Sequence, residues 1–136
     1  MTQTPASAIA PDLELIRQLA TDAIATLPEP FRAAAALVAL RVEDFADPEI
    51  LEALQIEDPY ELTGLYDGTP IPEKSVTDQP AQPDQIFLFR GPILTEWIER
   101  GDVSLGDLVA HVFIHELAHH FGWTDHDIAK IDPWWE

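Results

Sequence analysis

The chain has 136 residues, of which 46% are hydrophobic and 24% are charged, which is typical of a folded domain rather than a disordered segment. It is strongly acidic, because 25 Asp and Glu residues face only 7 Lys and Arg residues, for a formal net charge of −18. So few cations exclude tight binding to nucleic-acid phosphates, and an anionic membrane surface would repel the chain. The absence of cysteine excludes disulfides, iron–sulfur clusters and thiolate zinc sites.

The sequence carries no sign of export or of a membrane anchor. No basic residue precedes Arg17, and no window approaches 18 uninterrupted apolar residues. We therefore expect a cytoplasmic protein whose partners are neither nucleic acid nor membrane. Its charge would favour cationic peptides or metal ions as partners.

The first half of the chain predicts a helix, a strand and a short second helix. Residues 1–11 are small and polar and form a loose lead-in, and residues 12–136 are expected to form one domain. Asp12 can cap a helix whose apolar positions recur at helical spacing until Pro28 ends it. Residues 37–45 alternate between apolar and polar side chains and predict a strand. A short helix is expected from Pro48 to Leu54.

Glycine and proline are frequent in the middle of the chain, and residues 62–83 predict turns with only short strand pieces. Residues 85–90 (QIFLFR) predict the second clear strand, with its two phenylalanines on one side. Gly91 and Pro92 are expected to end that strand, and a short helix follows through Ile98.

The most informative helix is predicted in the last third of the chain. Ser104 with Asp107 three residues later resembles a capping box, and it starts a helix that runs to about Phe121. Apolar residues surround nearly its whole axis, which is typical of a helix inside a protein. Buried polar groups are costly unless they are satisfied, so the polar residues of this helix need partners. These polar residues are His111, His115, Glu116, His119 and His120.

Residues 115–119 read His-Glu-Leu-Ala-His, which is the HExxH pattern. His115 and His119 are about 6 Å apart along the axis on one helix face, so both imidazoles can lean toward one metal ion. Glu116 is rotated by about 60–100° from the two histidines, which places it beside the ligand face but within reach of a water on the metal. Zinc lowers the pKa of such a water toward ~7, and the carboxylate can take its proton as the water attacks a carbonyl.

A third protein ligand is expected after the helix, because catalytic zinc usually has three protein ligands and one open position. Gly122 stands where a helix end favours a left-handed residue, so the chain can turn back there. Asp125 follows at a distance that can return its carboxylate to the metal. His126 and Asp127 are alternative ligands. Asp125 could instead complement the N-terminus of a short final helix capped by Thr124.

The segment HELAHHFGWTD resembles the HExxHxxGxxH/D signature of metzincin-type zinc metalloproteases, and the chain resembles the small zincin-like bacterial metallopeptidases. The similarity includes residues 62–75 (LTGLYDGTPIPEKS), 83–94 (PDQIFLFRGPIL) and 119–128 (HHFGWTDHDI), and it runs from about residue 38 to residue 131. Full-size metzincins place a methionine in a turn beneath the metal. The only methionine here is Met1, which favours the small zincin-like branch.

The resemblance implies an α+β protein of minimal zincin-like fold, with a small mixed sheet and a buried active-site helix. It implies one Zn²⁺ per chain held by His115, His119 and Asp125, with Glu116 as the general base of peptide-bond hydrolysis. The substrate would be a peptide or protein, held along residues 86–89 or the neighbouring strand by main-chain hydrogen bonds. Metal binding should fail in acid, because ligand histidines must be neutral and the reference pKa of imidazole is about 6.5.

Other polar residues near the HExxH pattern are expected to have supporting roles. His111 lies two turns from His119 and fits a partly exposed position near the site, whereas His120 fits a hydrogen-bonded core histidine. Tyr66 is expected to pack or to support a hairpin.

The main alternative to a peptidase is a non-catalytic zinc-binding domain of the same fold, with a structural or interaction role. Such a site needs no general base and closes its fourth position with a protein group.

Overall fold

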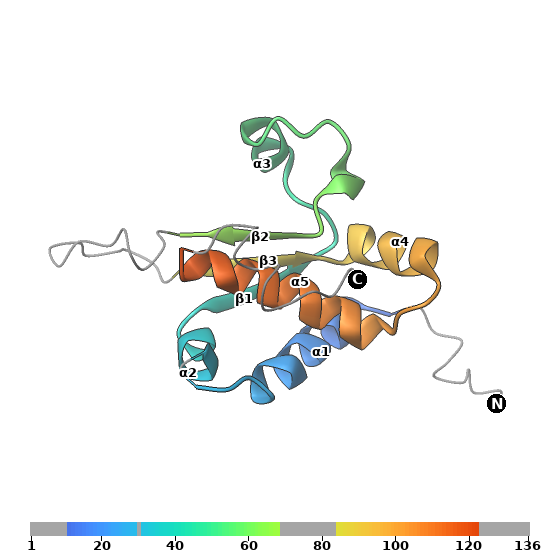
Figure 1. Cartoon of the computed structure of the whole chain (residues 1–136). Coiled ribbons are helices and arrows are strands. Elements are labelled where there is room, and N and C mark those ends of the chain that lie inside the picture. Colours follow the sequence, from blue (N-terminus) through green and yellow to red (C-terminus); the bar gives the residue numbers. More distant parts are fainter. Residues whose placement is uncertain (1–10, 30, 69–83, 123–136) are drawn as a thin grey trace, which may run out of the picture.

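The computed structural model describes residues 11–29, 31–68 and 84–122 (Figure 1). Its helices and its small sheet make an α+β fold, as predicted from the sequence. In chain order the elements are α1 (Leu13–Ala25), α2 (Phe31–Ala36), β1 (Ala39–Glu43), α3 (Pro48–Ala53), the 3-10 helix η2 (Pro59–Glu61), β2 (Gly64–Asp67), β3 (Gln85–Phe89), α4 (Arg90–Arg100) and α5 (Leu105–His120).

The sheet is mixed, and β3 is its central strand in the order β1-β3-β2. β1 pairs with β3 in parallel, with Leu40 opposite Ile86, whereas β2 pairs with β3 antiparallel, with Tyr66 opposite Ile86. Among the described residues β2 pairs only with β3, so it is an edge strand. The predicted small mixed sheet is therefore confirmed.

The two faces of β3 belong to different hydrophobic clusters, because successive side chains of a strand point to opposite faces. Ile86 and Leu88 are fully buried in the larger cluster, to which α1 and α5 contribute. Phe87 and Phe89 stack with ring centroids 5.9 Å apart and belong to the smaller cluster with residues of α3. Figure 1 shows the same division, with α5 and α1 on one side of the sheet and α3 on the other.

Local signals in the sequence set the helix ends as expected. The Asp12 carboxylate accepts a hydrogen bond from the Leu15 amide at 2.8 Å and caps α1. The Ser104 hydroxyl oxygen accepts one from the Asp107 amide at 3.0 Å and caps α5. Gly101, with φ of 72°, ends α4 in the left-handed conformation that glycine tolerates best. None of the helices in the described segments is long and apolar enough to cross a bilayer.

Three details of the fold differ from the sequence prediction. The helix α2 was not predicted, because six residues are too few to show an apolar period, although its four alanines favour a helix. β1 is shorter than the predicted strand over residues 37–45. α4 begins at Arg90 and includes Gly91 and Pro92, since a proline in the first helical turn needs no N–H partner.

Candidate metal centre

The helix α5 is buried on most of its surface, as the apolar pattern predicted. Its fully buried members include Leu108 and Val109, each with 0% exposure, and Phe113 with 1%. His115, Glu116 and His119 are only partly buried. The polar groups of the HExxH pattern therefore lie where a large part of the helix is covered but where a ligand can still reach them.

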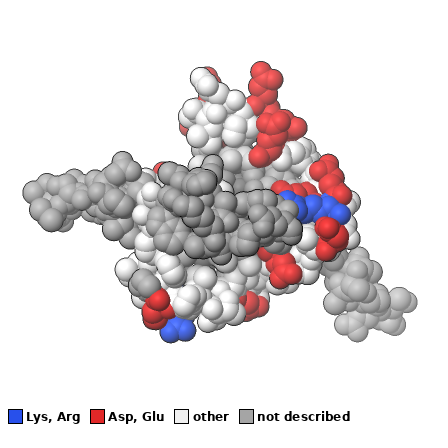
Figure 2. Space-filling view, viewed as in Figure 1, with Lys and Arg blue, Asp and Glu red and all other residues white. Residues whose placement is uncertain are grey.

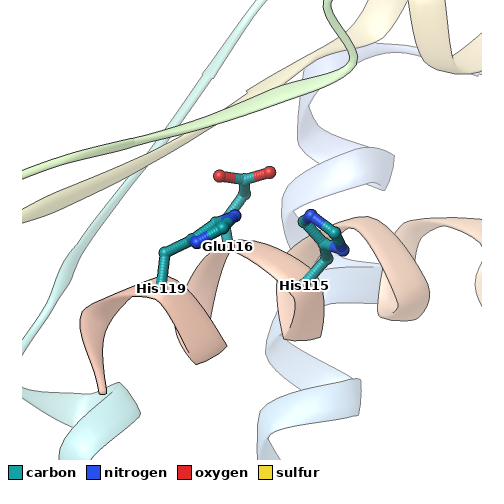
Figure 3. A group of neighbouring side chains, drawn as sticks. All are labelled: His115, Glu116 and His119. Carbon is teal, nitrogen blue, oxygen red and sulfur yellow. The ribbon is translucent and has the colours of Figure 1, made fainter. Parts of the chain in front are cut away.

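His115, Glu116 and His119 converge on one point. One ligand atom from each, an imidazole nitrogen or a carboxylate oxygen, lies within 4.8 Å of the other two. The two imidazole rings have centroids 5.0 Å apart and are nearly perpendicular at 77°. Figure 3 shows the three side chains rising from one side of α5 toward the sheet. Two imidazoles and a carboxylate are a donor set that suits a divalent transition metal, zinc above all.

The edge strand β2 passes directly beside this group, and the reason is a glycine. A Cβ atom on Gly64 would lie 2.7 Å from Val112 Cγ1 and 3.3 Å from Glu116 Cγ, so only glycine allows this approach. β3 is paired on both sides, so its residues 86–89 offer no free main-chain groups to a substrate. Among the described residues both neighbours of β3 have an open edge, and β2 is the neighbour that lies beside Glu116.

A cavity of about 330 Å³ opens onto the His-Glu-His group. His115 and Glu116 line it from α5, Glu61 from η2, and Glu96 and Arg100 from α4. The side chains that would bind and activate a ligand therefore face a space that could admit part of a peptide.

A family model described as zincin-like metallopeptidase matches residues 35–135, which is most of the chain. The chain belongs to the zincin-like metallopeptidase family. The match contains all three residues of the His-Glu-His group and the whole sheet. A search of curated proteins finds no match. The minimal zincin-like fold expected from the sequence thus agrees with both the family match and the α+β structure.

His120 is a hydrogen-bonded core residue, as predicted. It is 7% exposed, its Nδ1 lies 3.0 Å from the Tyr66 hydroxyl and 3.1 Å from Asp84 Oδ2, and the Tyr66 hydroxyl donates to that same oxygen at 2.6 Å. Sequence reasoning missed Asp84. Its only signal is a carboxylate just before a mainly apolar strand, which does not predict a partner 36 residues later.

His111 is partly buried and lines the cavity, with its ring centroid 6.2 Å from that of His115. It is not a member of the group whose ligand atoms converge. Both observations agree with the expectation that it lies near the metal site without ligating the same ion as His119.

The expected third metal ligand, Asp125, lies outside the described residues, as do its alternatives His126 and Asp127. The structure does describe the turn that leads toward them. Gly122 has φ of 78°, and its amide donates to the His119 carbonyl oxygen at 2.9 Å. The left-handed residue predicted at this helix end is confirmed.

Proposed function

We propose that the protein is a zinc-dependent peptidase in which His115 and His119 hold the metal and Glu116 is the general base. The observation that carries this proposal is the convergence of these three side chains beside an open cavity. The family match supports the same chemistry. Asp125, six residues after His119, is proposed as the third ligand, and one Zn²⁺ per chain as the cofactor.

Bound zinc would supply a Lewis acid that polarises the scissile carbonyl and acidifies water. Glu116 would take the proton of the attacking water and pass it to the leaving amine. The open edge of β2 would hold the peptide by main-chain hydrogen bonds, which brings the scissile bond close to Glu116 because Gly64 lets the strand lie against α5.

The cavity argues for catalysis over a purely structural metal. Structural zinc sites are closed by four protein ligands, whereas catalytic sites keep a position open to water and substrate. His115 and Glu116 both line the cavity, so the side of the site that they form faces open space.

The decisive experiment compares the parent protein with Glu116→Gln. Elemental analysis should find about one zinc per chain in both proteins, since the substitution leaves both histidines in place. Digestion of a peptide library, read by mass spectrometry, should show cleavage by the parent that a chelator abolishes. Turnover by Glu116→Gln should fall by at least about a hundredfold.

Two results would contradict the proposal. Equal turnover by Glu116→Gln and the parent would exclude Glu116 as the base. Stoichiometric zinc without cleavage of any peptide by the parent would favour the non-catalytic zinc-binding domain.

A further inference from the structure

The cavity beside the candidate metal site has the size of a pocket for one side chain. Its volume is about 330 Å³, near the lower end of the roughly 300–1,000 Å³ of ligand sites. It is lined by residues of α5, of α4 and of the chain from η2 into β2. It therefore has room for a long substrate side chain next to Glu116.

The described residues that line this cavity include more acidic side chains than lysine or arginine side chains. Arg100, the one lysine or arginine among the described lining residues, holds Glu96 through a contact of 2.9 Å between Nε and Oε2. Glu116 faces the point on which His115 and His119 converge, where a bound cation would offset its charge. The exposed Glu61 carboxylate forms no ion pair or hydrogen bond with any described side chain. Glu61 is thus the lining carboxylate left for a ligand.

The direction of β2 decides which substrate residue reaches the cavity. β2 runs from Gly64, beside Glu116, to the region of Tyr66, beside His120. A peptide that pairs antiparallel with β2 would run the opposite way, so its residues after the scissile bond lie toward Gly64. The cavity is lined by Gly64 and by the three residues before it, Glu61, Leu62 and Thr63. In this antiparallel orientation, the residue that follows the scissile bond is the one whose side chain enters the cavity.

We propose that this cavity binds a lysine or arginine side chain of the residue that follows the scissile bond, with Glu61 as its counter-ion. The inference rests on the proposed peptidase function. The surface of the molecule supports it, because carboxylates far outnumber cations on the face shown in Figure 2, and the few cations there lie next to acidic groups. With a formal net charge of −18, the chain attracts cationic peptides from a distance.

The first test is a peptide-library digestion by the zinc-loaded protein, with cleavage sites read by mass spectrometry. Lysine and arginine should be enriched directly after the cleaved bond. Two synthetic peptides that differ only in lysine or norleucine at this position should then differ about fivefold in kcat/KM, in favour of lysine. The preference should shrink as salt concentration rises.

Variants assign the preference to one carboxylate. Glu61→Gln should bring the lysine-to-norleucine ratio close to one. Glu57→Gln, which removes an exposed carboxylate that does not line the cavity, should leave the ratio unchanged. Binding of the same two peptides to zinc-loaded Glu116→Gln, measured by fluorescence anisotropy, should show the same preference without turnover, and adding Glu61→Gln should remove it.

The outcomes separate this inference from the function on which it rests. Cleavage with no enrichment of basic residues after the bond, or a ratio that Glu61→Gln does not change, would overturn the inference and leave the peptidase intact. The absence of any cleavage by the zinc-loaded parent would overturn the proposed peptidase function. Equal binding of the two peptides to Glu116→Gln would overturn the binding of lysine in the cavity, independently of turnover.

Discussion

The Tyr66 hydroxyl donates a 2.6 Å hydrogen bond to Asp84 Oδ2, joining the edge strand β2 to the start of β3. The same hydroxyl lies 3.0 Å from Nδ1 of His120, in the last turn of α5. The side chains of Asp84 and His120 are only 10% and 9% exposed, so their polar atoms depend on such contacts. This cluster ties the edge strand β2 to the helix turn that carries His119.

Removing the Tyr66 hydroxyl should therefore destabilise the protein. Tyr66→Phe keeps the ring but deletes a hydrogen bond to a buried carboxylate, and we expect a loss of about 1–3 kcal/mol in the free energy of unfolding. Urea denaturation of the metal-free protein measures it. Tyr60→Phe is the matched control, because Tyr60 is 50% exposed, and it should change stability by less than about 0.5 kcal/mol. Equal effects of the two substitutions would contradict a structural role for the cluster.

A methyl group at position 64 should disturb the approach of β2 to α5. The Cβ atom of Gly64→Ala would lie 2.7 Å from Val112 Cγ1, so the strand or the helix must shift. We expect a loss of about 1–3 kcal/mol in the free energy of unfolding. The kcat should also fall, and by a larger factor than the zinc content. Gly106→Ala is the control, because its Cβ would meet Leu19 Cδ2 at an ordinary 3.6 Å within a helix. It should leave stability unchanged or raise it by up to about 1 kcal/mol. A Gly64→Ala protein as stable and active as the parent would show that the close approach is not needed.

Metal content should depend on two of the five histidines. His115→Ala and His119→Ala each remove a ligand atom from the converging group, and purified protein should lose its equivalent of zinc. His111→Ala should keep it, because His111 lies outside that group. Elemental analysis after dialysis measures all three. If His111→Ala lost zinc and His119→Ala retained it, the metal site would lie one turn nearer the N-terminus of α5 than we propose.

Zinc binding should weaken steeply in acid. A protonated imidazole cannot ligate, and the pKa of imidazole in model peptides is about 6.5, so two histidine ligands must release protons to bind metal below that pH. Zinc affinity should therefore fall as pH falls from 7.5 to 5.5. Calorimetric titration at both pH values, corrected for buffer protonation, measures this. An affinity independent of pH over this range would exclude a site built on two histidines.

The sequence was sufficient to predict the longer helices and the convergence of His115, Glu116 and His119, because both depend on near neighbours. The cap at Ser104, the turn at Gly122 and the spacing of His115 and His119 all involve residues within one or two helical turns. A helix has a fixed rise and rotation per residue, so spacing alone predicts which side chains share a face. Six-residue α2 escaped prediction because it is too short to show that period.

The tertiary structure alone decided how distant segments surround α5. Nothing near Gly64 in the sequence predicts its contact with Glu116, 52 residues later, or the partnership of Asp84 with Tyr66 and His120. Nor does the pattern of QIFLFR reveal that β3 is central and β2 lies at the edge. Strand order and side-chain contacts across the core depend on how whole elements pack, and a single chain's local pattern does not encode that choice.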